Sequence, residues 1–179
     1  MIVDNILPFL PCEFRIKFAA SRWEREGSYA LRRAVFCEEQ GIFRTSDRDE
    51  TDDYAIPIVA LSMLGVASDQ VVGTVRIHEE APGVWWGSRL AVGHDYRRIG
   101  AIGATLIRLA VSSANAMGCK TFLAYVQEQN EPLFRQMSWS TIQEVDLHGR
   151  PHLKMQADRS AYPPSATPEL GYVALRKAA

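Results

Sequence analysis

The sequence predicts an α+β (α/β) fold, with a mixed, mostly antiparallel central sheet flanked by helices. Short apolar or alternating runs indicate strands. Apolar residues at helical spacing in residues 97–117, and a segment without a breaker between Gly27 and residue 39, indicate helices. Three successive strand segments within residues 56–92 favour antiparallel hairpins, because short turns join strands that run in opposite directions. A strand–helix–strand unit over residues 84–126 favours one parallel crossover.

The first predicted elements are a strand and a helix. The strand covers residues 13–19, in which phenylalanine and isoleucine alternate with other residues. The helix covers residues 24–39 and ends before Gly41.

An acidic segment follows at residues 47–53, where five of seven residues are acidic. The spacing of its acids resembles that of a calcium loop. An EF-hand loop is excluded, because its sixth position is Asp52 instead of glycine and its twelfth is Ile58 instead of glutamate. We therefore expect a solvated acidic loop.

The middle of the chain predicts three strands and a long helix. The strands cover residues 56–63, 70–78 and 84–92, with a turn signal of Ala-Pro-Gly before the third. The helix covers residues 97–117, and Gly118 suits the position that ends a helix.

The last third predicts a strand at residues 121–126, a short helix at 130–137 and a closing hairpin of residues 139–145 and 152–157. Beyond residue 158 the chain holds three prolines. These residues, 159–179, are expected to form an extended arm.

The hairpin holds the one close pair of histidines, His148 and His152. A glycine and a proline lie between them, so a turn is preferred to a metal site.

Composition and charge exclude several classes of protein. The sum of 20 basic and 21 acidic residues gives a net charge of −1, which lacks the positive field of nucleic-acid or membrane-surface binders. No apolar run reaches the roughly 18 residues of a membrane span, and the first residues lack the basic start of a signal peptide. Three widely spaced cysteines argue against a disulfide framework. A cytoplasmic protein with one main domain is expected.

The strongest chemical signal lies in residues 89–107. A strand leads through a loop with two arginines and two glycines into the long helix. A helix N-terminus exposes unpaired N–H groups and a partial positive charge that attract phosphate. Gly100 and Gly103 let a ligand approach the backbone, and Arg97 and Arg98 add positive charge. The P-loop and dinucleotide-binding patterns are absent.

In this segment the sequence resembles the GNAT superfamily of N-acetyltransferases, which bind acetyl-CoA with a loop of the form R/Q-x-x-G-x-G/A. The preferred register runs over residues 98–103 and puts Ala101 where the first glycine is usual. The other register starts at Arg97 and puts Ile102 at the small position.

The resemblance extends from about residue 13 to residue 158. Residues 31–40, with the acidic segment after them, resemble the "R..VF..EQ … D.D..D" opening of several GNAT branches, and residues 130–139 resemble its "N..FY.K.GF" segment. Residues 148–158 resemble the end of a bacterial branch associated with nitrilase gene clusters and nitrogen starvation.

The resemblance implies a GNAT-like fold, a single acyltransferase domain in residues 1–158, and direct transfer of an acetyl (acyl) group from CoA to the amine of a small molecule. No metal is implied, and a homodimer, as in many relatives, stays open. The backbone of residues 90–92 would face the thioester, and residues 99–104 would hold the pyrophosphate. The residues assigned to the cofactor are Leu90, Ala91, Val92, Arg97, Arg98, Ile99, Gly100, Ala101, Ile102, Gly103, Ala104, Thr105, Asn130 and Phe134.

The catalytic groups depart from the family pattern. The frequent tyrosine acid falls on Phe134, and the usual glutamate of the fourth strand is missing from residues 85–89. Tyr125 is a candidate for the missing acid. Glu79, Glu80 and Glu39 are candidate bases. Packing or solvation is an alternative explanation for each of them.

Two further hypotheses about the function remain open. One is a non-catalytic acyl-CoA sensor, and the other is a synthase that takes its acyl group from a carrier protein, as homoserine-lactone synthases do. The loop at residues 98–103 favours CoA, because carrier proteins present no adenosine pyrophosphate. The neighbouring Trp85 and Trp86 alternate faces on a strand, so one ring can line the acceptor pocket.

Overall fold

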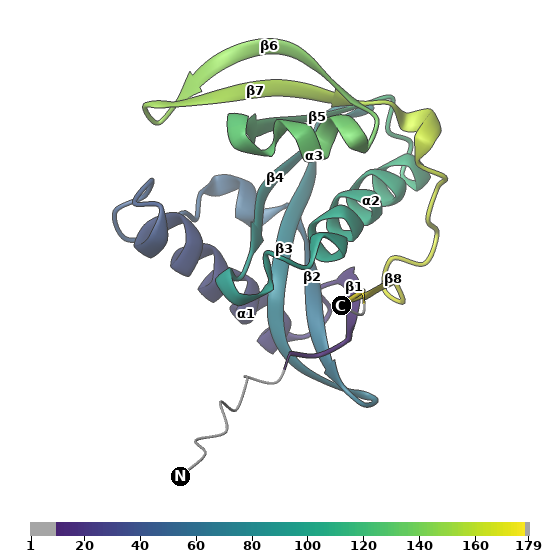
Figure 1. The fold of residues 1–179 in the computed structure, drawn as a ribbon. Helices are drawn as coiled ribbons and strands as arrows, with labels where there is room; N and C mark the ends of the chain where they lie inside the picture. Colours follow the sequence, from purple (N-terminus) through teal and green to yellow (C-terminus); the bar gives the residue numbers. More distant parts are fainter. Residues whose placement is uncertain (1–9, 178–179) are drawn as a thin grey trace.

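One eight-stranded sheet runs through residues 10–177 of the computed structural model, the residues that the structure describes (Figure 1). Its strand order is β6-β7-β5-β4-β3-β2-β1-β8. The strands are β1 (Glu13–Phe18), β2 (Ile56–Leu64), β3 (Ala67–Ala81), β4 (Val84–Val92), β5 (Thr121–Gln127), β6 (Trp139–Leu147), β7 (Arg150–Ala157) and β8 (Tyr172–Leu175). All pairings are antiparallel except β4 with β5, which confirms the mixed sheet and the predicted crossover.

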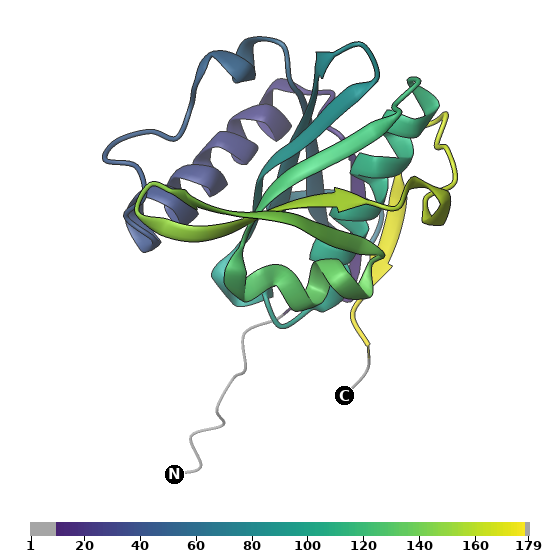
Figure 2. The same cartoon turned by 90° about the horizontal axis from the view of Figure 1, so that it is seen from above.

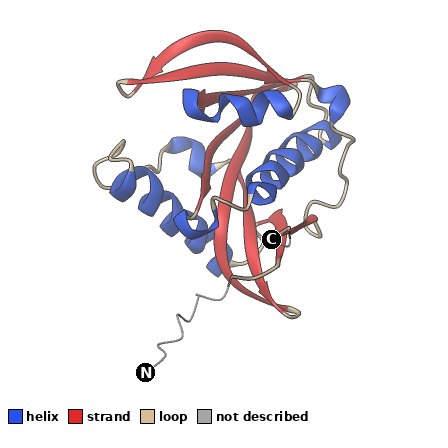
Figure 3. Cartoon of the chain, in the orientation of Figure 1, coloured by secondary structure: helices blue, strands red, loops and turns tan. Residues whose placement is uncertain are grey.

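Helices cover both sides of this sheet (Figure 3). The α-helices are α1 (Arg22–Arg32), α2 (Gly100–Ala116) and α3 (Glu131–Gln136). The first one continues as the π-helix η1 (Arg33–Glu39), so the predicted helix is present but widens after its third turn. Among the described residues no helix is long and apolar enough to cross a membrane.

The two long helices lie on opposite faces of the sheet (Figure 2). Thr74 on β3 faces α1, where its hydroxyl lies 2.7 Å from that of Ser28. The adjacent Gly73 faces α2, and a Cβ there would lie 2.9 Å from Leu106. The alternation of a strand thus gives each helix its own face.

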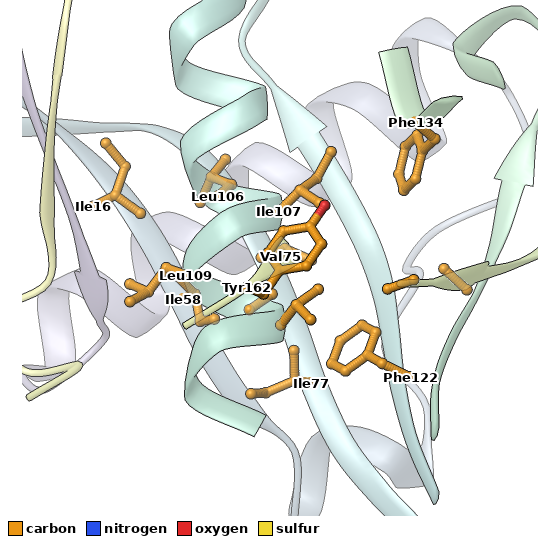
Figure 4. Packing of buried hydrophobic residues seen from close by; sticks show 14 of the residues in the cluster. Ile16, Ile58, Val75, Ile77, Leu106, Ile107, Leu109, Phe122, Phe134 and Tyr162 are labelled. Carbon is orange, nitrogen blue, oxygen red and sulfur yellow. The ribbon is translucent and has the colours of Figure 1, made fainter. Parts of the chain in front are cut away.

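The main core lies between α2 and the sheet (Figure 4). Ile58, Ile77 and Leu106 are fully buried there. Tyr162, which follows the last long strand, is also buried in this core, where Trp139 donates a hydrogen bond to its hydroxyl at 3.0 Å.

The C-terminal tail is part of the sheet, which corrects the expected extended arm. The N–H of Phe18 donates to the carbonyl of Pro168 at 2.9 Å, and β8 then pairs with β1. The prolines of the tail suggested an arm, but they lie before β8 and leave its ladder intact. Residues 1–9, which hold the predicted start without a signal peptide, and residues 178–179 lie outside the described part.

The closing hairpin turns at His148 and Gly149, which both have positive φ, of 55° and 70°. Two such residues form the turn that matches the twist of a hairpin. This confirms the predicted turn between His148 and His152. Within residues 10–177, no group of three histidine, cysteine or acidic residues is placed to hold a metal ion.

Gly171 precedes β8 and has a φ of +67°, and a Cβ there would lie 1.8 Å from the carbonyl oxygen of Ile16. We expect Gly171→Ala to displace β8 and lower the free energy of unfolding by about 3 kcal/mol or more, because backbone strain and a backbone clash combine. Urea unfolding followed by circular dichroism measures this loss.

Gly65→Ala is the matched control, since Gly65 has a φ of +63° but no atom within 4 Å of the added methyl group. It is expected to cost only about 1 kcal/mol. Equal losses for the two variants would contradict the docking of the tail through Gly171.

Candidate active site

Strands β4 and β5 separate before either strand ends. Their parallel ladder reaches only to Gly87 on β4 and Ala124 on β5. β4 continues to Val92 and β5 to Gln127, and within residues 10–177 no further ladder pair joins them. Each strand therefore presents an edge without a strand partner, where an extended ligand with amide groups can bind. We call this opening the β4–β5 cleft.

A β-bulge lies in β4 at the start of the cleft. Thr74 and Arg76, two residues apart on β3, pair with Ala91 and Ser88, which are three apart on β4. Arg89 occupies the bulge with a φ of +56°. Such a conformation costs a residue other than glycine about 1–3 kcal/mol, so its surroundings must hold it. Bulges of this kind re-aim a strand next to active sites.

A buried network of three arginines and three aspartates holds the bulge. Its members are Arg32, Asp47, Asp49, Asp52, Arg76 and Arg89. Arg32 on α1 donates to Asp47 at 2.7 Å and to Asp52 at 2.6 Å. Arg89 donates to the backbone carbonyl of Asp47 at 3.0 Å, and its Nε lies 3.0 Å from the carboxylate of that residue.

Arg76 completes the network from β3. Its two terminal nitrogens bind both oxygens of Asp49 at 2.7 and 2.9 Å, and its Nε donates to Ser88 at 2.9 Å. A bidentate pair of this kind fixes orientation as well as charge. The three positive and three negative charges compensate one another, as buried charges must.

The expectation of a solvated acidic loop at residues 47–53 is therefore wrong for Asp47 and Asp52, whose side chains are buried, whereas Asp49, Glu50 and Asp53 are exposed. Asp47 is only 2% exposed, while the side chain of Asp49 is 42% exposed. Burial alone would raise the pKa of Asp52, but hydrogen bonds from Arg32 and Arg76 outweigh it and hold that pKa well below its ordinary value. The hydrogen bond from Arg76 likewise lowers the pKa of Asp49.

The N-terminus of α2 lies directly after β4 and its connecting loop. The capping residue is Ile99, and no side chain accepts from the first N–H groups of the helix. A Cβ at Gly100 would meet no atom within 4 Å, and one at Gly103 would meet Leu133 and Val92 only at 4.0 Å. The helix start therefore has free donors and room for an anion such as a phosphate.

The two arginines of this loop differ in their surroundings. Arg97 donates from Nε to the carbonyl of Val92 at 3.0 Å, and its terminal nitrogens bind both oxygens of Glu39. Arg98 is exposed and has no hydrogen-bond or ion-pair partner among the described residues. Arg98 is thus the arginine whose charge is available to a ligand.

The three predicted catalytic side chains do not lie together. Glu39 is bound to Arg97, and the hydrogen bond from Arg97 lowers the pKa of Glu39, which makes it a weaker base. Glu79 accepts from a backbone N–H of the β3–β4 turn at 2.7 Å. Tyr125 alone lies beside the cleft, one residue beyond the end of the ladder, with its ring 5.0 Å from that of Trp86.

The other residues assigned to the cofactor differ in their position relative to the cleft. Residues 90–92 form its β4 edge, and residues 99–105 form the start of α2. Asn130 is exposed, immediately before α3. Phe134 is buried, and its ring packs edge-on against Trp139 at 5.0 Å, so this ring faces the core.

His78 on β3 is a candidate that the sequence did not indicate. It pairs across the sheet with Trp86, and its buried Nδ1 has no hydrogen-bond partner among the described residues. Burial and the nearby charge of Arg76 lower the pKa of His78, which favours the neutral imidazole but, as for Glu39, also makes it a weaker base. A single histidine in an apolar strand gives no pattern that would reveal this surrounding.

The sequence matches the Acetyltransferase (GNAT) family over residues 24–136, more than half of its length. The chain therefore belongs to the GNAT family of acetyltransferases, and its fold is the mixed α/β fold of that family. A comparison with curated proteins gives no match.

Solved structures of related fold agree with this assignment. A Lactobacillus plantarum protein assigned as an N-acetyltransferase is 26% identical with a TM-score of 0.71, covering 80% of this chain and 97% of its own. A chain of the NatC complex bound to Gag peptide and CoA is 13% identical with a TM-score of 0.60, covering 80% and 97%. The AHL synthase LasI is 13% identical with a TM-score of 0.63, covering 80% and 87%. The last two show similarity of fold alone.

The buried network predicts a large loss when one partner is neutralised. We expect Asp52→Asn to lower the free energy of unfolding by about 3 kcal/mol or more, because it leaves Arg32 and Arg76 buried with an incomplete partner. Glu26→Gln, in the exposed pair with Arg22, is the control and should cost less than about 0.5 kcal/mol. Similar losses in urea unfolding would show that the network does not stabilise the fold.

The same network predicts how stability depends on pH. The folded-state pKa values of Asp49 and Asp52 lie below the unfolded value of about 3.9, so their contribution is present above that value and is lost as the pH falls. The wild type should therefore lose stability more steeply than Asp52→Asn between about pH 5 and pH 3. Parallel losses in urea unfolding across this range would contradict the assignment.

Proposed function

We propose that this GNAT protein is an acetyl-CoA-dependent N-acetyltransferase, which transfers an acetyl group to the amine of a small molecule by direct attack. The observation that carries the proposal is the β4–β5 cleft, open beside the uncapped start of α2. Membership of the family supports an acyl-CoA donor, and the similarity to the Lactobacillus plantarum protein supports acetyl transfer.

The residues present fit the donor. The free edge of residues 90–92 suits an extended arm that carries amide groups, and the first N–H groups of α2 with Arg98 suit a pyrophosphate. When bound, acetyl-CoA supplies an activated thioester carbonyl. Backbone N–H groups on the cleft edge of β4 are available to stabilise negative charge that develops on the carbonyl oxygen.

The chain must also take a proton from the acceptor, because only a neutral amine is a nucleophile. His78 is the proposed proton acceptor, since its lowered pKa favours the neutral imidazole. Its Nδ1 is buried, so Nε2 is the nitrogen that would receive the proton. Glu39 and Glu79 are both engaged in other interactions. Tyr125, whose hydroxyl has no partner among the described residues, remains the proposed donor to the departing sulfur.

Further features of the sequence bear on the acceptor and on the compartment. The resemblance of residues 148–158 to the nitrilase-cluster branch supports a bacterial metabolic role. Three free cysteines, Cys12, Cys37 and Cys119, suit the reducing cytoplasm. We propose a metabolite-sized acceptor, without a metal, nucleic acid or membrane, and the homodimer stays an open alternative.

A second candidate is the synthase that takes its acyl group from a carrier protein, since the fold of LasI is similar. Its phosphopantetheine arm would use the same cleft, but it would bring a single phosphate to the α2 start and Arg98 in place of the pyrophosphate and adenosine of CoA. The acyl-CoA sensor rests on Phe134, which stands where the family often has a tyrosine acid.

Release of free thiol from acetyl-CoA in the presence of an amine panel tests the proposal. We expect turnover of at least one amine, together with thermal stabilisation by acetyl-CoA alone. Stabilisation without turnover of any amine would favour the sensor. Turnover only with acyl carrier protein would favour the synthase.

The donor site is tested by reversing the charge of Arg98. Arg98→Glu should raise the Kd for CoA about tenfold or more, because it removes a charge-assisted contact with phosphate. A glutamate before a helix N-terminus favours the helix, so the loss cannot come from its unwinding. Arg108→Glu, exposed on the same helix, is the control. Isothermal titration that gives equal Kd values for both variants would refute the assignment of the loop.

A further inference from the structure

A row of aromatic rings lies on the α1 face of the sheet, where β4 and β5 separate. It consists of Tyr54, His78, Trp86 and Tyr125, which we call the aromatic platform. The rings of Tyr54 and His78 are 5.7 Å apart, and those of Trp86 and Tyr125 are 5.0 Å apart and tilted by 32°. His78 and Trp86 are cross-strand partners, so the two pairs of rings lie on the same face of neighbouring strands.

The platform is accessible although its rings are held in place. Tyr54 is 61% exposed and Tyr125 is 45% exposed. The indole N–H of Trp86 donates to Glu80 at 2.8 Å, which fixes the ring at the surface. The Trp86 ring is not part of the main core, whereas the neighbouring Trp85 is buried there on the α2 face. Exposed aromatic side chains gathered in this way mark a binding site.

The platform borders the β4–β5 cleft. Trp86 precedes Gly87 and Tyr125 follows Ala124, the last pair of the ladder. The rings share the α1 face with Arg76 and Thr74, whereas α2 covers the opposite face. An acceptor that approaches from the α1 face would therefore contact these rings beside the point where the proposed donor enters.

A free positive charge lies at the edge of the platform. Lys154 on β7 is the register partner of Tyr125, and its Nζ lies 5.4 Å from the ring centre of Trp86. Lys154 has no carboxylate partner among the described residues. The side chain of Lys154 is half-buried, and its ammonium group is available to a carboxylate of a ligand.

We propose that the acceptor is an amine that carries both an aromatic ring and a carboxylate, as an aromatic amino acid does. Its ring stacks on Trp86 and Tyr125, and its carboxylate pairs with Lys154. The inference rests on the proposed acetyltransferase function. In the reaction the amine nitrogen bonds to the acetyl carbonyl carbon, and the carbon–sulfur bond breaks with its electron pair on sulfur. One amine proton passes to His78, Tyr125 donates a proton to the departing sulfur, and the products are the N-acetyl amino acid and CoA with a free thiol.

Thiol-release kinetics with matched acceptors test this inference. We expect kcat/KM for L-phenylalanine to exceed that for phenethylamine, which lacks the carboxylate, and for L-alanine, which lacks the ring, by about tenfold or more. Preference for an aliphatic amine or a polyamine would overturn the inference and leave the acetyltransferase function intact. Absence of acetyl-CoA binding would overturn the proposed function itself. Absence of L-phenylalanine binding in calorimetry with CoA-loaded protein would overturn the inference alone.

Two variants separate the ring contact from the charge contact. Lys154→Gln should lower kcat/KM for L-phenylalanine about tenfold and change that for phenethylamine less than about twofold. Trp86→Leu should lower both values, with acetyl-CoA binding retained as evidence of folding. Lys120→Gln, on an exposed residue after α2, is the control and should change neither value. Equal effects of Lys154→Gln on both acceptors would show that Lys154 does not bind the carboxylate.

Discussion

One network of charged side chains ties α1, the acidic segment, β3 and β4 together. It consists of Arg32, Asp47, Asp49, Asp52, Arg76 and Arg89. The network is neutral in sum, and its hydrogen bonds replace the water that each charge loses on burial. Its position explains the shape of the site. It holds the strained bulge of β4, and the ladder between β4 and β5 stops just before that bulge. The opening between the strands thus depends on charges that lie outside it.

The π-helix η1 and the residues after it connect this network with the open end of the cleft. Arg32 ends α1 inside the network, and seven residues later Glu39 binds Arg97 in the loop before α2. The next residue, Gln40, accepts from the side chain of Gln127 at 3.0 Å, at the end of β5, and its carbonyl accepts from Arg150 on β7. One segment therefore contacts both sides of the cleft where the strands end. π-Helical turns are rare and occur often at functional sites, which agrees with this position.

Most of the fold follows from local sequence patterns. The wrong predictions concern residues whose contact partners are far away in the sequence. Apolar patterns predicted every long strand and α2, the absence of a breaker predicted α1, and the glycine-rich loop located the α2 start. The ion pairs of the acidic segment could not be predicted, because Arg76 and Arg89 lie 27 and 42 residues away from their aspartate partners. Arg97 and Arg98 are equivalent in sequence, and only the contact with Glu39, 58 residues away, distinguishes them. Four residues of β8 after three prolines gave too short a pattern to be recognised as a strand.

We propose that the donor binds between β4 and β5, with its phosphates at the start of α2. A crystal structure of the protein with CoA tests this most directly. We expect electron density for the pantetheine arm along residues 90–92, and density for the pyrophosphate at the N–H groups that follow Ile99, within reach of Arg98. CoA bound elsewhere, with β4 and β5 closed against each other, would contradict it.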